Sequence, residues 1–193
     1  MEAAIMAAIA NAGSAEALDA AYDDKADTMI VYLDDLAADE LFDVEEGRLR
    51  AQCDALLAAA ERVGWGLNVR LTTDDEIRFL NRVHRGKDMP TDILSFSSDS
   101  GGMLGDLAIS LPYVARSIVA DAQLSAEERA ADRARGGAYG RLVDEQTVAR
   151  RLPLLIVHGI CHLLGHDHED DGDHVRMLAL EEAILQAASG HID

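Results

Sequence analysis

Four short segments of the sequence have the hydrophobic pattern of β-strands. Residues 67–71 alternate apolar and polar side chains, as a strand does when one of its faces is buried. Residues 29–33, 93–96 and 104–109 are compact apolar runs rich in β-forming side chains. The pattern therefore predicts a small sheet of about four strands.

Helical spacing of apolar residues is found between and after these strands. Apolar positions recur every three to four residues over 49–60, and Thr73 with Glu76 forms a capping box that begins a second helix. Residues 111–151 are also predicted to be helical. Their centre, 134–140, is Ala/Arg-rich and broken by glycines, which predicts a surface loop.

The most apolar stretch of the chain is residues 152–164, in a helix predicted to begin near Val143. Pro153 must start or kink this helix, because proline cannot donate the backbone hydrogen bond of a helix interior. A last helix is predicted over 173–188. Strands mixed with helices in 193 residues predict a single domain of the α/β or mixed α+β class.

Charge is distributed unevenly along the chain. The formal net charge of −19 argues against a general nucleic-acid coat protein, which needs an excess of Lys and Arg. Residues 1–47 hold 13 acidic residues and one basic residue, residues 167–193 hold eight and one, and residues 48–166 hold 15 of each. The neutral middle could therefore meet an anionic partner.

The N-terminal residues, the lack of a long apolar run and the two cysteines predict where in the cell the protein is found. Residues 1–27 are Ala-rich and acidic, which predicts an appended helix or a partly ordered arm, and Glu2 makes the apolar start a poor signal peptide. No run approaches the length of a membrane span. Cys53 and Cys161 give no disulfide framework, and Cys161 is expected to be a small buried hydrophobe. We expect a cytoplasmic protein, or one of an organellar stroma or matrix, with no membrane partner.

Five of the seven histidines lie between residues 158 and 174. His158 and His162 are four residues apart, so a helix places them on one face. Gly165 allows the backbone to turn, which places His168 to fold back toward the same face. Three imidazoles with a fourth position open to water is the pattern of catalytic zinc. His166 and Asp167 are rival ligands, and Asp167 could instead orient a ligand imidazole.

This spacing is also the metalloprotease pattern His-Glu-x-x-His-x-x-Gly-x-x-His, with one change. Gly159 stands where the general-base glutamate should be. Proteolysis is therefore the weaker hypothesis, and it requires a carboxylate near the metal from elsewhere in the chain. A metal-activated water can still attack an ester if a cation stabilises the charge that builds on its oxygens.

The histidine segment, residues 158–168, closely resembles the signature of the YbeY family of endoribonucleases. Residues 81–96 (Asn-Arg-Val-His-Arg-Gly-Lys-Asp-Met-Pro-Thr-Asp-Ile-Leu-Ser-Phe), 104–110 (Leu-Gly-Asp-Leu-Ala-Ile-Ser) and 177–182 (Met-Leu-Ala-Leu-Glu-Glu) resemble the same family. The resemblance covers about residues 66–186 and comprises several blocks in the family's order.

The resemblance implies a fold, a function and a set of site residues. The implied fold is a mixed sheet with helices packed on it. It implies a metal-dependent, single-strand-specific endoribonuclease of ribosomal RNA maturation, including 16S rRNA 3′-end processing, and of ribosome quality control. It implies one Zn²⁺ ion at His158, His162 and His168, on a buried C-terminal helix, and a functional arginine at Arg85. The implied partners are single-stranded RNA, ribosomal RNA, and the ribosomal small subunit or its associated proteins. The oligomeric state stays open.

Two basic residues are the candidates for contact with the RNA backbone. Arg85 is the catalytic candidate, because a guanidinium binds phosphate through two parallel hydrogen bonds. Lys87 is a candidate second phosphate contact that binds substrate. Asp92 and Asp106 could orient these cations, and neither is predicted to be catalytic.

The sequence departs from the family pattern in three places. Ser97 replaces a proline, an insertion lies around residues 124–141, and residues 1–27 form an extra arm before a metallohydrolase domain predicted at 28–193. None of these touches the predicted ligands. Two alternatives remain: a zincin-like metalloprotease, and a non-catalytic, zinc-containing binding module of the ribosome with a closed coordination sphere.

Overall fold

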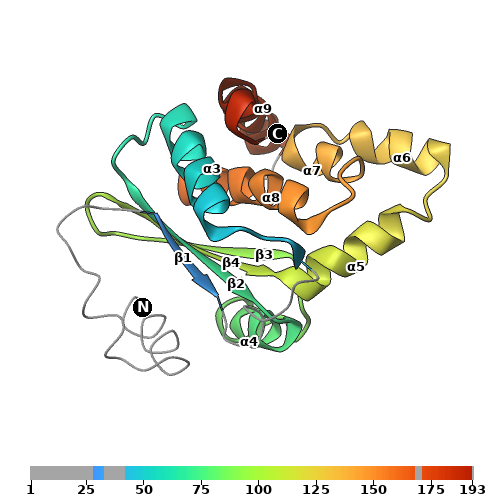
Figure 1. Cartoon of the computed structure of the whole chain (residues 1–193), viewed down its shortest axis with the longest axis horizontal. Coiled ribbons are helices and arrows are strands. Elements are labelled where there is room, and N and C mark those ends of the chain that lie inside the picture. Colours follow the sequence, from blue (N-terminus) through green and yellow to red (C-terminus); the bar gives the residue numbers. More distant parts are fainter. Residues whose placement is uncertain (1–27, 33–41, 168–170, 193) are drawn as a thin grey trace.

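A four-stranded mixed sheet with helices on both faces organises the protein (Figure 1). The structure, a computed structural model, describes residues 28–32, 42–167 and 171–192. The predicted class, a mixed α/β sheet covered by helices, is confirmed. The predicted helix or arm at residues 1–27 lies outside the described residues.

The strands lie in the order β1-β2-β4-β3. They are β1 (Met29–Tyr32), β2 (Gly66–Thr72), β3 (Ile93–Ser97) and β4 (Met103–Ser110). β1 pairs with β2 and β2 with β4 in parallel, whereas β3 runs antiparallel to β4 and forms one edge. Each strand coincides with a predicted segment to within about a residue at each end.

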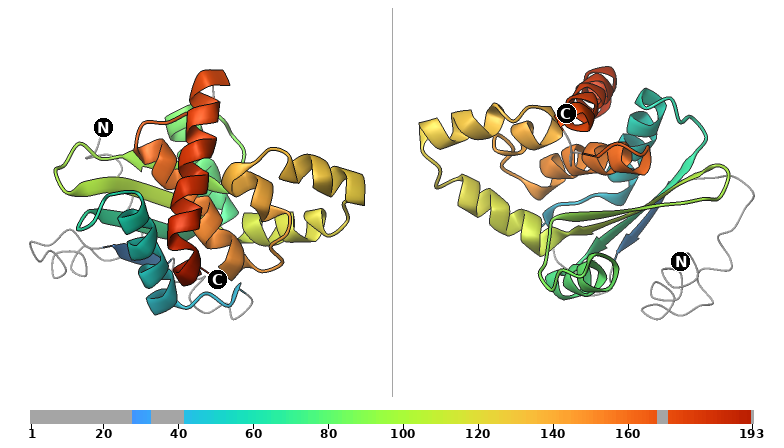
Figure 2. Two further views of the ribbon diagram at one scale, coloured as in Figure 1. Left: turned by 90° about the horizontal axis from the view of Figure 1, so that it is seen from above. Right: turned by 180° about the vertical axis from the view of Figure 1, so that it is seen from behind.

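Seven helices cover this sheet in the part of the chain that the structure describes. They are α3 (Glu46–Ala59), α4 (Asp74–Arg85), α5 (Leu111–Asp121), α6 (Ala126–Arg133), α7 (Gly137–Leu142), α8 (Val148–Leu163) and α9 (Asp171–Ile192). α3 and α8 lie on one face with α9 packed over them, and α4 lies on the opposite face (Figures 1 and 2). No described helix is long and apolar enough to cross a membrane.

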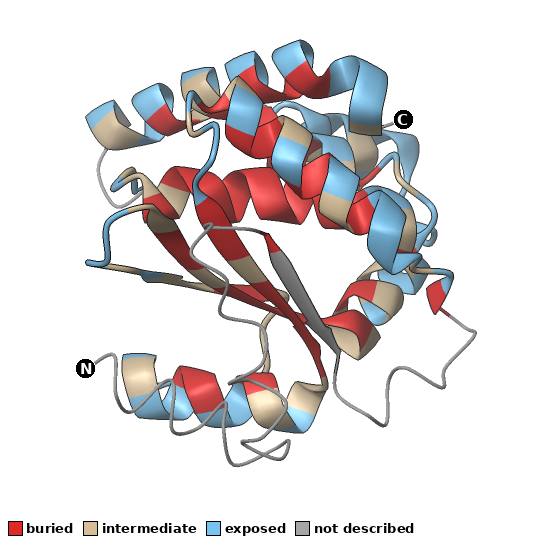
Figure 3. Cartoon of the chain, turned by 60° about the vertical axis from the view of Figure 1, so that its left-hand side comes forward, coloured by how far each residue is buried: buried red, intermediate tan, exposed pale blue. Residues whose placement is uncertain are grey.

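The main core lies between α8 and the sheet. Every residue from 151 to 161 is buried, because α8 has the sheet on one side and α3, α7 and α9 on the others (Figure 3). The closest approach is at Gly159, where a Cβ atom would lie 2.6 Å from Leu107 Cδ2 and 3.0 Å from Ile93 Cδ1. Glycine is therefore the residue that lets α8 pack directly on the sheet.

The capping box predicted at Thr73 is half formed. Thr73 Oγ1 accepts from the backbone N–H of Glu76 at 3.4 Å, as a helix N-cap does. The Glu76 carboxylate does not return to the cap. It accepts from Thr72 Oγ1 at 2.7 Å and pairs with Arg70, whose buried guanidinium needs a counter-charge.

The surface loop predicted at residues 134–140 is present only at 134–136, where the chain turns and Ala134 and Arg135 are exposed. Residues 137–142 form α7, and Gly137, Ala138 and Gly140 are buried. Positive φ angles of 74° at Gly136 and 57° at Gly137 make the turn before this helix. The glycines that predicted exposure serve instead to bring α7 close to its neighbours.

The predicted bounds of the last two helices also needed correction. α8 begins at Val148, with Thr147 as its N-cap, and not near Val143. Pro153 lies inside α8 and does not start it. α9 extends the last predicted helix at both ends.

Candidate metal centre

His158 and His162 lie one turn apart on α8 and point to the same place. Their Nε2 atoms are 3.0 Å apart, and their rings meet edge to face with centroids 4.6 Å apart. His158 is buried and His162 is partly buried. The predicted convergence of these two imidazoles is therefore present in the described structure.

The other ring nitrogens fix the protonation of both imidazoles. His158 Nδ1 lies 2.7 Å from Glu181 Oε1, and His162 Nδ1 lies 3.0 Å from the backbone oxygen of His166. A carbonyl and a carboxylate accept hydrogen bonds, so we assign the proton to Nδ1 in both rings. Each Nε2 then presents a lone pair to the other.

Two facing lone pairs at 3.0 Å repel each other unless a proton or a metal ion lies between them, and such a pair is well placed to bind a metal ion. Zinc binds imidazole nitrogen at about 2.0–2.1 Å, so two nitrogens of one tetrahedral site lie about 3.3 Å apart. The observed separation is close to that value. Histidine ligands of metals also usually donate their second N–H to a carboxylate or a carbonyl, as both do here. The two residues fit a metal site.

Glu181 orients His158 and was not predicted. It lies on α9, is 2% exposed, and accepts the backbone N–H of Ala138 on its second oxygen at 2.9 Å. One carboxylate therefore joins α7, α8 and α9 at the metal centre. The spacing of residues along α9 could have identified it, because Glu181 lies on the same buried stripe as Met177, Ile184 and Leu185. A carboxylate on an apolar stripe needs a buried partner.

The turn after α8 positions the backbone carbonyl that accepts a hydrogen bond from the His162 ring. Gly165 has a φ of +88°, and the backbone N–H of His166 bonds the carbonyl of Cys161 at 3.0 Å. This turn directs the His166 carbonyl to His162, so His166 contributes its backbone here. His168, the predicted third ligand, lies outside the described residues. No group of three potential ligands occurs among the residues that are described.

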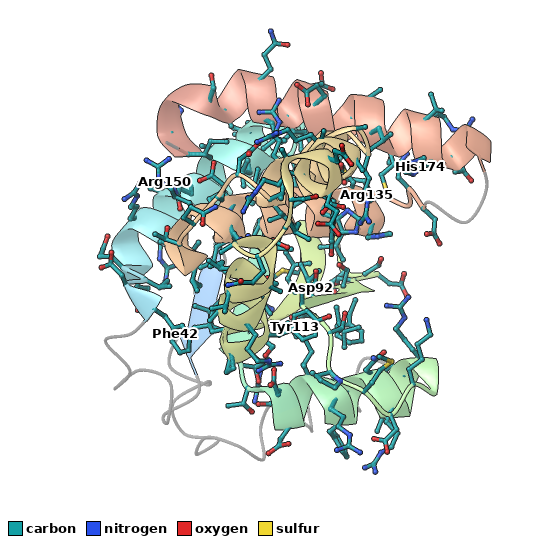
Figure 4. All side chains as sticks on the ribbon, turned by 90° about the vertical axis from the view of Figure 1, so that its right-hand side faces the viewer. Phe42, Asp92, Tyr113, Arg135, Arg150 and His174 are labelled. Atoms are coloured by element: carbon teal, nitrogen blue, oxygen red, sulfur yellow. The ribbon has the colours of Figure 1, made fainter. Side chains whose placement is uncertain are left out.

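A cavity of about 390 Å³ opens beside His158. Its remaining lining residues are Arg135, Gly136, Tyr139, His174, Met177, Leu178 and Glu181. Arg135 and His174 lie on the same side of the molecule (Figure 4). The cavity is large enough for a small-molecule group and combines an apolar wall with basic side chains.

Tyr139 links the metal helix to the loop that follows Arg85. Its ring meets His158 edge to face with centroids 4.5 Å apart, and its hydroxyl donates to Asp92 Oδ2 at 2.5 Å. Burial, together with the charge of Asp92, raises the pKa of Tyr139 well above its usual value, so the hydroxyl stays a donor. Asp92 is the residue just before β3, at the end of that loop.

The predicted roles of the two aspartates are wrong. Asp92 is engaged by Tyr139, by Thr91 and by the backbone N–H of Ile93. Asp106 accepts from Asn68 Nδ2 at 2.7 Å, and burial raises the pKa of its carboxyl. Neither orients Arg85 or Lys87. Both aspartates instead support the backbone and strands around the sheet.

Arg85 and Lys87 lie at the end of α4, on the opposite face of the sheet from α8. Both are exposed, and among the described residues neither forms an ion pair. The structure therefore does not bring them into contact with His158 or His162 in the described part of the chain. They lie across the edge strand β3 from the metal centre.

The cysteines are not part of the site. Cys53 and Cys161 are fully buried, and burial raises the pKa of each thiol to about 12. The expectation that Cys161 is a small buried hydrophobe is confirmed.

Comparison with known proteins identifies the family. A family profile described as Endoribonuclease YbeY matches residues 37–132 and 138–189. An Endoribonuclease YbeY of Anaeromyxobacter dehalogenans is 40% identical over 147 residues, covering 74% of this chain and 64% of the relative. One of Chloroflexus aurantiacus is 34% identical over 169 residues, covering 81% of this chain and 95% of the relative.

The similarity extends along most of the chain, although it spans 64% of the length of the Anaeromyxobacter relative. A solution structure of a Thermotoga maritima protein is 22% identical, with a TM-score of 0.49 over 84% of this chain and 89% of that one. The family match and the Chloroflexus relative decide the assignment. The chain belongs to the YbeY family of endoribonucleases.

Proposed function

We propose that this protein is a zinc-dependent endoribonuclease that hydrolyses single-stranded RNA during ribosomal RNA maturation, including 16S rRNA 3′-end processing, and in ribosome quality control. The observation that carries the proposal is the convergence of His158 and His162, each held by an acceptor on its Nδ1. Its relatives bear the name endoribonuclease, which supports RNA as the substrate.

One Zn²⁺ ion would be held by His158, His162 and His168, leaving a position for water. When bound, zinc supplies a Lewis acid and lowers the pKa of that water. The donor set supports this assignment, because two neutral imidazoles with oriented lone pairs suit zinc.

The chain's own residues hold the site and meet the substrate. Glu181 and Tyr139 fix the ring of His158, and the cavity beside it would receive the RNA backbone near the bond to be cut. Arg85 is the candidate catalytic residue, because a guanidinium stabilises charge that builds on phosphate oxygens. Lys87 is a candidate substrate contact two residues further on.

The metalloprotease alternative is less well supported. Gly159 supplies no carboxylate, and Leu107 and Ile93 leave no room for a side chain at this position. Glu181 is close to His158, but its oxygens are engaged by Nδ1 and by the Ala138 N–H. Neither position offers a free general base. The non-catalytic binding module would need a fourth protein ligand and would cut no RNA.

The proposed setting is the bacterial or organellar ribosome. The partners are ribosomal RNA and the small subunit or its proteins, and the location is the cytoplasm or an organellar stroma or matrix. The balanced charge of residues 48–166 supports binding to an anionic partner despite the net charge of −19.

The test measures bound metal and cleavage together. Labelled single-stranded RNA and casein are incubated with the wild type, His162→Ala and Arg85→Ala, and zinc content is measured for each. We expect His162→Ala to lose zinc and RNA cleavage, and Arg85→Ala to keep zinc but lose cleavage by about 10²–10³-fold.

Two exposed residues provide matched controls. His191→Ala removes an exposed histidine near the end of α9, and Arg150→Ala removes an exposed arginine from the first turn of α8. Both should keep zinc and activity. RNA cleavage that survives in His162→Ala, or casein cleavage without RNA cleavage, would contradict the proposal.

A further inference from the structure

The outward face of α4 combines basic and apolar side chains. This α4 face consists of Arg78, Phe79, Arg82 and Val83, and Arg85 and Lys87 continue it at the end of the helix. The opposite side of the helix buries Ile77, Leu80 and Asn81 against the sheet. Packing against the sheet therefore explains the residues on the inner side of α4. It does not explain why the exposed outer side combines basic and apolar residues (Figure 3).

Two members of this face form a flat, exposed platform. Phe79 is 46% exposed, and the guanidinium carbon of Arg82 lies 5.6 Å from the centroid of its ring. Val83 is 56% exposed beside them. An aromatic ring and a guanidinium plane are the groups on which unstacked bases stack.

The charge of this surface is positive in a strongly acidic protein. Asp88 binds Arg78 at 2.8 Å, and Asp88 also interacts through space with Arg82, which helps to lower its pKa. Asp75, exposed in the first turn of the helix, also interacts through space with Arg78. Two carboxylates thus face the four cations of the surface, whose summed charge stays positive. Arg85 and Lys87 form no ion pair among the described residues.

The acidic residues in the first turn of α4 lie at its other end. Asp74 binds Arg116 at 2.5 Å, and Glu76 pairs with the buried Arg70. Asp75 is exposed there, at the end of the helix away from Arg85 and Lys87. The end of α4 that leads to β3 is therefore the basic end.

The α4 face and the metal centre flank the same stretch of the edge strand β3. Below the sheet, the His84 ring meets the Phe96 ring with centroids 5.0 Å apart. Above the sheet, Leu163 packs at Gly105, which pairs with Ser97. The end of α4 and the histidine end of α8 are therefore on opposite sides of residues 96–97.

β3 is the edge strand of the sheet. An extended polymer can therefore run around it from the α4 side of the sheet to the α8 side. Leu94 and Phe96 point to the α4 side, where they join Ile77 and Leu80. Side chains alternate along a strand, so Ser95 and Ser97 face the α8 side. Small polar side chains therefore line the strand next to the metal centre.

We propose that the α4 face is the docking surface for the single strand of RNA that passes around β3 from the metal centre, with the Phe79–Arg82 pair as a stacking platform. The inference rests on the function proposed above. RNA fits this surface better than a protein does, because the exposed apolar groups are few and each lies beside a cation.

The test measures RNA binding separately from cleavage. His162→Ala serves as the background so that the strand stays intact, and fluorescence anisotropy gives the Kd for labelled strands of about 20 and about 4 nucleotides. We expect Phe79→Ala and Arg82→Ala each to weaken binding of the long strand by about tenfold. Binding of the short strand, which fills only the metal cavity, should change by less than about twofold. Arg82→Ala should also reduce the slope of log K against log salt by about one.

The chain offers a matched control for the platform. The guanidinium carbon of Arg62 lies 5.3 Å from the centroid of the Trp65 ring, in the turn between α3 and β2. Arg62→Ala and Trp65→Ala should leave the Kd of the long strand unchanged. Thermal unfolding of every variant checks that the fold is intact.

The outcomes separate this inference from the proposed function. Unchanged binding of the long strand in both α4 variants would overturn the inference and would leave α4 as a surface for a protein partner. An equal loss in the Arg62 and Trp65 variants would overturn it too, because the effect would then be nonspecific. Absence of cleavage by the wild type, with length-dependent binding at α4, would contradict the proposed function alone.

Discussion

At the scale of single residues, the geometry of the metal centre depends on Glu181. This carboxylate accepts from His158 Nδ1 and from the Ala138 N–H, and so fixes the direction of the Nε2 lone pair. An amide in its place would offer one acceptor and one donor. Its NH₂ group would then face either the Nδ1 proton or the backbone N–H, both of which are donors.

We therefore expect Glu181→Gln to weaken zinc binding by about 10–100-fold. The measurement is competition for zinc against a chelating dye, which needs no RNA. Glu182→Gln is the control, because the exposed Glu182 pairs with Arg141 at the surface. Equal zinc affinity in Glu181→Gln and the wild type would show that His158 needs no orienting carboxylate.

Sequence spacing predicted one part of this centre and missed another for a physical reason. His158 and His162 are neighbours on one helix, so their convergence follows from the helical period alone. Glu181 reaches the same ring from 23 residues away, through the packing of α9 on α8. Local periodicity carries no information about which residue of a later helix faces a given ligand.

At the scale of elements, the position of α8 depends on its contact with the sheet at Gly159. A methyl group there would lie 2.6 Å from Leu107 Cδ2 and would push the helix away from β4. The same helix carries His158 and His162, one position before and three positions after Gly159. The packing of one glycine therefore sets the distance between the metal centre and the sheet.

Gly159→Ala should lower the free energy of unfolding. Overpacking costs about 1–3 kcal/mol, which exceeds the gain of about 1 kcal/mol when alanine replaces glycine in a helix. Gly190→Ala in α9 is the matched control, because no atom lies within 4 Å of the added Cβ, and it should be neutral or stabilising. Urea unfolding measures both, and a Gly159→Ala protein as stable as the wild type would contradict this packing.

The elements differed in how well they could be predicted. The strands, α3 and α4 were predicted because alternation and helical spacing are local patterns. The sequence predicts a loop at α7, because Gly137 and Gly140 are poor helix formers in isolation. Burial against α8 and α9 compensates for that propensity, and only the tertiary structure shows this burial.

At the scale of the whole molecule, charge is segregated along the chain. The acidic excess lies in residues 1–47 and 167–193, whereas the basic end of α4 lies in the balanced middle. Residues 1–27, which the structure does not describe, carry part of this excess. An acidic arm competes with RNA for basic surfaces, and salt screens that competition.

Deleting residues 1–27 should therefore leave RNA cleavage intact or raise it at low salt. The difference from the full chain should shrink as the ionic strength rises, because the Debye length falls from about 30 Å at 0.01 M to about 8 Å at 0.15 M. Cleavage rates across a salt series measure this. A clear loss of activity at all salt concentrations would show that the arm is part of the folded domain.

The clamp that Glu181 makes between α7, α8 and α9 also sets an order of events during synthesis. Ribosomes add about 5–20 residues per second, and N-terminal segments emerge first. All four strands and α4 precede Leu111 in the chain, whereas the orienting carboxylate follows 23 residues after His158. The metal centre therefore cannot be complete until α9 has been made, which is later than every strand of the sheet.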